Sequence, residues 1–192
     1  MKQATGLFIS LSWVVFFLFI TISAFSVKRT VQVAREWKWS WLAPIPFVIA
    51  ILLIKYVWHL RPHSIKMTLW PWTPEVGAVA DILAFAGLFV ALWGRVALAR
   101  NWSISPALKE NHQLIKRGPH AYVRHPMYSG LCLMLLGAVI WFGKGIGFIF
   151  FAACFLGTWL KLRAEEKLMT KHFGDEYLKY KAQVKALIPY VF

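Results

Sequence analysis

A basic loop runs into a long apolar segment through the sequence Arg124-His125-Pro126-Met127-Tyr128-Ser129-Gly130. Proline fits best in the first turn of a helix, where its missing N–H is not needed, so Pro126 predicts the start of a membrane helix. Arg124, His125 and Tyr128 would then gather at the mouth of that helix. The amides of a first turn and the positive end of the helix dipole attract negative charge, so we expect this mouth to hold an anion.

The composition indicates an integral membrane protein. Of the 192 residues 59% are hydrophobic and only 16% are charged, with 11 Trp and 15 Phe. One soluble core cannot bury that much apolar surface. The uncharged run from 5 to 27 exceeds the roughly 20 residues that cross about 30 Å of hydrocarbon, and we interpret it as a retained anchor rather than a cleaved signal peptide.

The apolar segments predict an all-α fold, a polytopic membrane protein with about five transmembrane helices and a cytosolic C-terminal helical segment. The tight turn Gly143-Lys144-Gly145 separates the last two spans, Gly174 is expected to end their polar continuation, and Asp175 is expected to cap a last short helix. We divide the chain into residues 1–99, with three spans, and residues 100–192, within one structural domain overall. The expected spans are 5–27, 39–58, 76–99, 126–142 and 145–161.

The distribution of basic residues predicts the orientation. Placing the 28–38 loop, the 100–124 loop and the C-terminal tail on one side collects most of the 22 Lys and Arg there, which makes that side cytosolic. Arg95 is expected to snorkel to water from the inner end of its span, and Asp81 is left unassigned. The net charge of +14 brackets hydrophobic spans, so attraction to anionic lipid explains it better than nucleic-acid binding.

Two polar segments are expected to meet at the cytosolic face, namely the loop 101–125 and the helix entered at Lys161. A loop this long, polar and aromatic is typically functional. Carboxylates at Glu165 and Glu166 would oppose the basic mouth and could hold ammonium, hydroxyl or ribose groups, so the pair of segments suits a zwitterionic ligand. A plainer interpretation stays open, in which Arg124 anchors the span and Glu165 simply pairs with Lys161 on the helix surface.

Other chemistries have no sequence support. The chain contains no G-x-S-x-G, H-E-x-x-H, Walker loop or paired C-x-x-C, which argues against a serine hydrolase, a zinc protease, a nucleotidase and a zinc site. Cys132 and Cys154 lie inside apolar segments and are expected to be packing residues. We therefore expect no metal.

A combination of motifs in the second half of the chain resembles the isoprenylcysteine carboxyl methyltransferase family. The likeness covers roughly residues 100–192, about half of the chain, and both the order and the spacing match. Its elements are His112-Gln113-Leu114-Ile115, Gly118, Arg124-His125-Pro126-Met127-Tyr128, Glu165-Glu166 and Phe173-Gly174-Asp175-Glu176-Tyr177-Leu178-Lys179-Tyr180.

The resemblance implies an integral membrane methyltransferase that binds S-adenosylmethionine, and releases S-adenosylhomocysteine, between the last spans and the C-terminal helices. His120 departs from the family, which usually has tyrosine there. The positions that correspond to the cofactor contacts of the family are His112, Gln113, Leu114, Ile115, His120, His125, Pro126, Met127, Tyr128 and Glu165.

The resemblance also implies where the acceptor binds. Family members generally carry arginine at the position of Lys161, where it holds the acceptor carboxylate; lysine keeps the charge but loses the two-pronged grip. We expect Lys161 and Arg163 to orient a lipophilic small-molecule or prenylated acceptor, most simply an isoprenylcysteine-type carboxylate, while another lipidic acid, amine or thiol stays open. A carboxylate is already ionised at neutral pH, so no general base and no covalent step are expected.

Three alternatives remain at this stage. A phospholipid N-methyltransferase would share the C-terminal signature and would need a base, for which Glu166 or His120 are candidates. A membrane sterol-type reductase would bind NADPH in a related layout. A lipid-binding or scaffolding membrane protein would bind neither cofactor.

Overall fold

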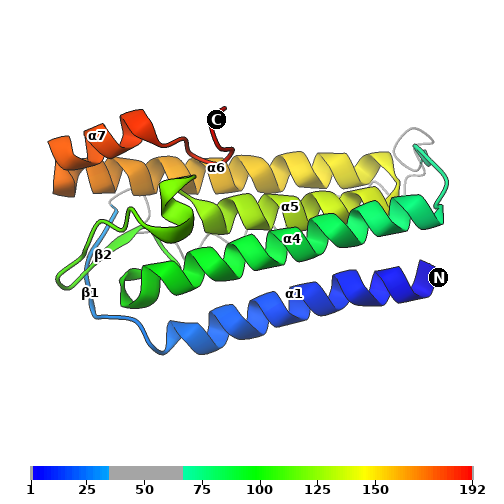
Figure 1. Ribbon diagram of the computed structural model, residues 1–192, viewed down its shortest axis with the longest axis horizontal. Helices are drawn as coiled ribbons and strands as arrows, with labels where there is room; N and C mark the ends of the chain where they lie inside the picture. The colour runs from blue at the N-terminus through cyan, green and yellow to red at the C-terminus, as the bar shows by residue number, and fades with distance from the viewer. Residues whose placement is uncertain (1, 35–66, 192) are drawn as a thin grey trace, which may run out of the picture.

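The computed structural model describes residues 2–34 and 67–191 of the chain. Four long helices run side by side along the longest dimension of the molecule, and a fifth, short helix folds back against the end of the last long one (Figure 1). The helices are α1 (Lys2–Ala24), α4 (Pro74–Leu98), α5 (Pro126–Phe142), α6 (Gly145–Phe173) and α7 (Asp175–Gln183).

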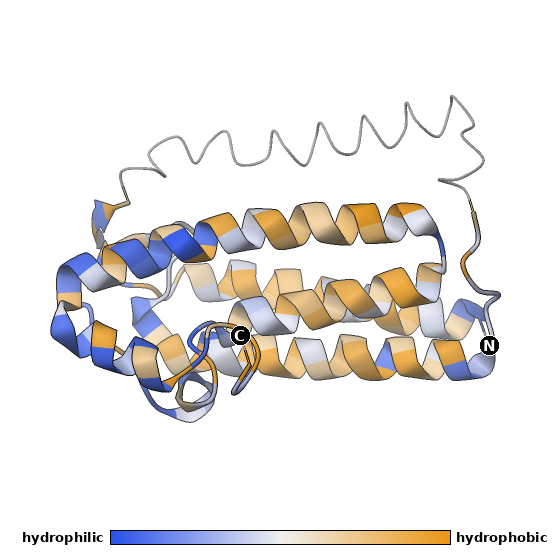
Figure 2. Cartoon of the chain, turned by 90° about the horizontal axis from the view of Figure 1, so that it is seen from above, coloured by the Kyte–Doolittle hydropathy of each residue, from blue (hydrophilic) through white to orange (hydrophobic). Residues whose placement is uncertain are grey.

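The described helices confirm an all-α integral membrane protein. Three stretches are long and apolar enough to cross a bilayer, Lys2–Ala24, Pro74–Asn101 and Gly145–Phe173, and α5 is a shorter apolar helix. Hydrophilic residues gather at the end of the bundle that carries α7, while apolar residues dominate the rest (Figure 2). The span expected at 39–58 lies outside the described residues, so the total of five spans stays a prediction.

Local chemistry sets the helix boundaries where the sequence predicted them. Pro126 is the first residue of α5, and the φ of +65° at Gly143 ends it in the left-handed conformation that glycine adopts without penalty. Gly174, with φ +53°, ends α6. Asp175 was expected to cap α7, but the cap position is taken by Gly174. Asp175 lies in the first turn of α7, where its charge still complements the helix dipole.

Small residues bring α4 and α5 into close contact. A Cβ atom added to Gly87 would lie 2.6 Å from the carbonyl oxygen of Gly130, and one added to Gly137 would lie 2.6 Å from the carbonyl oxygen of Ala80. Larger side chains at these positions would push the two backbones apart. Packing through small residues is the usual way in which membrane helices associate, because lipid supplies no hydrophobic driving force between them.

A short β-ribbon, which the sequence did not predict, ties the end of α1 to the loop after α4. Strand β1 (Thr30–Val33) pairs antiparallel with β2 (Ala107–Lys109), and Lys109 donates from Nζ to the hydroxyl of Thr30 at 2.8 Å. The ribbon lies at the polar end of the bundle (Figure 1). It fixes the path of the loop that follows, whose residues form part of the site below.

The position of Arg95 differs from the one expected. Arg95 does not snorkel to water but is 3% exposed, and its guanidinium donates to the carbonyls of Ser23 at 2.6 Å and Ala99 at 2.8 Å. The guanidinium carbon also lies 4.5 Å from the ring centre of Trp102. Arg95 therefore joins the C-terminal ends of α1 and α4, whose last carbonyls have no partner within their own helices.

Candidate functional site

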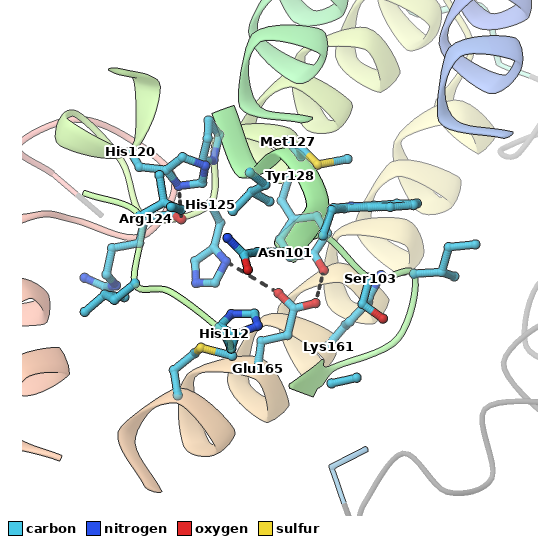
Figure 3. A pocket seen from close by; sticks show the side chains of 18 of the residues that line it. Asn101, Ser103, His112, His120, Arg124, His125, Met127, Tyr128, Lys161 and Glu165 are labelled. Carbon is cyan, nitrogen blue, oxygen red and sulfur yellow. Dashed lines mark hydrogen bonds and ion pairs between the residues drawn. The ribbon is translucent and has the colours of Figure 1, made fainter. Parts of the chain in front are cut away.

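A cavity of about 340 Å³ lies at the polar end of the bundle, within the size range of small-molecule sites. Its walls come from α1, the loop after α4, the start of α5, the polar half of α6, and α7 (Figure 3). Phe16, Ile20 and Leu131 add apolar surface from within the bundle. All ten residues that the resemblance assigned to the cofactor line this cavity: His112, Gln113, Leu114, Ile115, His120, His125, Pro126, Met127, Tyr128 and Glu165.

Glu165 brings a carboxylate from α6 to two aromatic rings at the start of α5. The Tyr128 hydroxyl donates to Oε1 of Glu165 at 2.5 Å, and Nδ1 of His125 lies 3.6 Å from Oε2 (Figure 3). The rings of His125 and Tyr128 stack with centres 5.6 Å apart and an interplanar angle of 16°. A carboxylate beside stacked aromatic faces favours a ligand that carries positive charge.

Glu166 faces the basic mouth, as expected, but it does not line the cavity. Its Oε1 accepts hydrogen bonds from Nε and NH2 of Arg124 at 2.8 and 2.5 Å, and its Oε2 accepts from Nζ of Lys181 at 2.6 Å. Arg124 also donates to the carbonyl of Val184. Arg124 borders the cavity, but its charge is matched by Glu166 and not reserved for an anionic ligand.

The segment 184–187 crosses the mouth of α5. Backbone amides of Arg124 and His125 donate to the carbonyls of Lys185 and Ala186 at 2.8 and 3.0 Å, and the Ser129 hydroxyl donates to the carbonyl of Leu187 at 2.6 Å. The amides of Tyr128 and Ser129 donate to the carbonyl of His125. Fewer amides are therefore free at this helix start than the sequence suggested, and an anion there has correspondingly weaker support.

His112 is held in its neutral form by the loop around it. The backbone N–H of Lys109 donates to its Nδ1 at 3.2 Å, so Nδ1 must carry a lone pair. Burial, the largest cause, and the nearby charges of His172, Lys28 and Lys109 together lower the pKa of His112 from 6.5 to about 4. Lys28 also donates to Oδ1 of Asn101 at 3.2 Å, which anchors the start of the same loop.

His120 belongs to the short helix η4 (Gly118–Ala121), and its side chain is buried. Nδ1 of His120 lies 3.1 Å from the carbonyl oxygen of Arg124, and the Tyr180 hydroxyl donates to the backbone carbonyl of His120 at 2.6 Å. Burial is the main cause that lowers the pKa of His120. The carbonyl of Arg124 thus fixes the ring of His120, and Tyr180 of α7 fixes the backbone of His120.

The two residues expected to orient the acceptor lie in different places. Lys161 lines the cavity, and its Nζ lies 5.3 Å from the ring centre of Tyr128. Arg163 is exposed and does not line the cavity; its guanidinium carbon lies 5.7 Å from the ring centre of Trp159. The geometry supports a role at the cavity for Lys161 and gives none to Arg163.

Sequence reasoning missed several wall residues. Trp102, from the loop after α4, and Tyr177 and Tyr180, from α7, line the cavity. Burial raises the pKa of Tyr180 to about 12, so its phenol stays protonated as a hydrogen-bond donor. Both tyrosines belong to the motif that carries the resemblance, yet their spacing alone indicated only helix packing.

Comparisons with known proteins agree with this placement. The phospholipid methyltransferase family matches residues 76–176, more than half of the chain. Relatives named protein-S-isoprenylcysteine O-methyltransferase include one from Schizosaccharomyces pombe, 30% identical over 111 residues, with 55% of this chain and 46% of the relative covered. One from Rattus norvegicus is 28% identical over 131 residues and covers 62% and 45%.

A relative of another name matches over more of the chain. A methanethiol S-methyltransferase from Crocosphaera subtropica is 24% identical over 191 residues, which cover 88% of this chain and 72% of the relative. This chain spans about half the length, or less, of the isoprenylcysteine methyltransferases it matches. The family match and these relatives confirm the resemblance drawn from the motifs: the chain belongs to the phospholipid methyltransferase family, which here includes the isoprenylcysteine carboxyl methyltransferases.

Proposed function

We propose that this protein is an integral membrane methyltransferase that transfers a methyl group from S-adenosylmethionine to a lipophilic acceptor, an isoprenylcysteine-type carboxylate. The observation that carries the proposal is the meeting of three distant segments at one cavity. The segment 112–115, the start of α5 and Glu165 of α6 all line it. In relatives of this family the named activity is methyl transfer.

The residues present fit such a cofactor. Glu165 offers a carboxylate, and the stacked rings of His125 and Tyr128 offer aromatic faces, which together match the positive groups of a sulfonium amino acid. The neutral ring of His112 and its extended neighbours 113–115 form a wall with few charges. When bound, S-adenosylmethionine supplies an electrophilic methyl group on its sulfonium sulfur.

The side chains then act by binding and alignment. Glu165, Tyr128 and His125 hold the donor, and Lys161 attracts the acceptor carboxylate to the same cavity. A carboxylate is ionised at neutral pH and needs no base, so no side chain has to accept a proton. Apolar walls from α1 and α5 exclude water from the reacting groups.

The proposed active site faces the cytosol. The cavity lies at the end of the bundle where hydrophilic residues gather (Figure 2), and the basic loops and tail belong to that end. Basic residues favour the cytosolic side of a membrane.

A thiol acceptor is the second candidate, and two observations favour it. The methanethiol S-methyltransferase covers far more of this chain than the isoprenylcysteine enzymes do. Lysine at 161 also lacks the paired N–H groups with which arginine grips a carboxylate. A thiol such as that of cysteine has an ordinary pKa of about 8.5, so the rate with a thiol acceptor should rise with pH above neutrality. A carboxylate is fully ionised there, so its rate should stay constant, and the pH profile separates the two acceptors.

Calorimetry on the purified protein tests the cofactor. We expect S-adenosylhomocysteine to bind and NADPH not to bind, and Glu165→Gln to weaken binding at least about tenfold because a charge-assisted contact is lost. Glu110→Gln, at an exposed position outside the cavity, is the matched control and should bind as the unaltered protein does. Binding of NADPH alone would indicate a reductase, and binding of neither a non-enzymatic role.

Labelled S-adenosylmethionine then tests the acceptor. The protein is incubated with a prenylcysteine carboxylate, with a small thiol, or with a membrane lipid extract, and the labelled product is identified. For a carboxylate acceptor, Lys161→Ala should raise KM more than it alters cofactor affinity. Label on a phospholipid amine would instead assign the phospholipid N-methyltransferase reaction.

A further inference from the structure

The C-terminal tail returns toward the apolar part of the bundle after α7. Figure 1 shows α7 folding back from the end of α6, and the chain after α7 returning toward the middle of the bundle along its long axis. Ala186 and Leu187 are buried against Leu162, next to the half-buried Trp159. At this level of α6 the apolar run gives way to charged residues, the position at which tryptophan marks a membrane interface.

Beyond Leu187 the chain presents apolar side chains outward. Ile188 is 52% exposed, Tyr190 is 89% exposed and Val191 is 73% exposed. The amide of Val191 donates to the carbonyl of Ile188 at 3.2 Å, so these residues form a turn. We call residues 188–191 the terminal turn.

Two exposed basic residues adjoin the buried contact of Leu162 with Ala186 and Leu187, which precedes the terminal turn. Lys185 is exposed just before the buried pair, and Arg163 is exposed just after Leu162 on α6. An apolar turn with basic neighbours, held at the depth where a span leaves the bilayer, matches the chemistry of a leaflet with anionic headgroups above and acyl chains below.

We propose that the terminal turn inserts into the headgroup boundary of the membrane leaflet nearest the cavity, and that anionic phospholipid strengthens this insertion through Lys185 and Arg163. The insertion does not depend on which reaction takes place in the cavity. It gives the protein a second membrane attachment besides its spans, made by residues 188–191.

The insertion is connected to the cavity by backbone hydrogen bonds. The segment 184–187, which leads into the terminal turn, accepts hydrogen bonds from Arg124, His125 and Ser129 at the start of α5. A tail that is fixed in the leaflet therefore keeps its carbonyls in place at the mouth of α5. Membrane attachment and the geometry of the cavity wall are thus coupled through four residues.

Lipid quenching of a fluorescent probe tests the insertion. In the full chain with Cys132→Ala and Cys154→Ala, Val191→Cys carries the probe, and the protein is placed in vesicles of brominated phosphatidylcholine with or without phosphatidylglycerol. Asp175→Cys is the matched control, because Asp175 is exposed and follows the end of α6, which lies about 18 Å along that helix from Lys161. We expect strong quenching at position 191 and little at position 175.

The contribution of anionic lipid to the insertion is tested separately. Adding phosphatidylglycerol should increase quenching at position 191, and Lys185→Gln should lower the insertion equilibrium about fivefold in those vesicles only. The Tm in detergent, measured on the same variants, shows that each of them is folded. The proposal would be overturned if quenching at position 191 were no greater than at position 175. It would also be overturned if quenching at position 191 did not change with phosphatidylglycerol.

Discussion

Glu165 and Glu166 are neighbours on α6 that face different surroundings. Successive helical residues point about 100° apart, so one carboxylate reaches the cavity while the other reaches Arg124 and Lys181. The two adjacent carboxylates therefore have separate roles, one at the cavity and one in holding helices together. Glu165 is available to a ligand. Glu166 joins α6 to Arg124, two residues before Pro126, and to Lys181 of α7.

Removing the charge at Glu166 should destabilise the protein. The side chains of Glu166 and Arg124 are 5% and 8% exposed, and loss of one member of such a buried pair typically costs about 3 kcal/mol because the other charge stays unmatched. We expect Glu166→Gln to lower the Tm in detergent clearly. Glu176→Gln, which breaks an exposed pair with Lys116, should change the Tm little. Equal Tm values for the two variants would contradict this assignment.

The neutral state of His112 predicts a pH dependence of stability. Its pKa falls from an ordinary 6.5 to about 4 in the folded protein, so below pH 6.5 the unfolded chain takes up a proton that the folded chain does not. The stabilisation is present above pH 6.5 and is lost as the pH falls from there toward 4. His112→Asn keeps an acceptor for the Lys109 amide but does not titrate. Its Tm should fall less steeply over this window, and parallel curves would refute the assignment.

At the scale of elements, the contact between α4 and α5 sets the position of the site. The close approach at Gly87 and Gly130 continues to Gly94, where an added Cβ would lie 2.9 Å from a ring carbon of Pro126. The start of α5 is thus packed directly on the last turns of α4. Any change that separates these helices also moves His125 and Tyr128 away from Glu165.

Adding one methyl group at Gly130 should be costly. A Cβ atom there would meet the backbone of Gly87 and Ala91, which cannot yield as a flexible side chain can, and such overpacking costs about 1–3 kcal/mol. Gly130→Ala should lower both the Tm and the affinity for S-adenosylhomocysteine. Gly157→Ala on α6 is the control, because no described atom lies within 4 Å of the added group. It should be neutral or stabilising by up to about 1 kcal/mol; an equal loss in both variants would argue against close packing as the cause.

Across the whole molecule, the sequence predicted what short-range chemistry decides. Pro126 begins α5, the Gly143 turn joins α5 to α6, and Gly174 ends α6, because each depends on the backbone preferences of one or two residues. The spans follow from apolar runs alone. The ten residues that the resemblance assigns to the cofactor all line one cavity.

Contacts between distant segments could not be predicted in the same way. The β-ribbon joins residues 30–33 to 107–109, and the segment 184–187 accepts hydrogen bonds from residues near 125, with no local pattern that specifies either pairing. Arg124 suggested a ligand contact because its partner, Glu166, lies 42 positions away. A buried pair and a ligand site use the same residue types, and only the folded geometry separates them.

The distribution of charge over the whole molecule predicts which compartment each end faces. Lys144, in the turn between α5 and α6, and Asp175, at the start of α7, lie at opposite ends of α6, a helix of 29 residues that is about 43 Å long. Because basic loops and the tail gather at the α7 end, we expect that end in the cytosol. In a chain with Cys132→Ala and Cys154→Ala, a membrane-impermeant maleimide should label Asp175→Cys only in inside-out vesicles. Lys144→Cys should be labelled only in right-side-out vesicles, and the reverse pattern would place the cavity on the outer face.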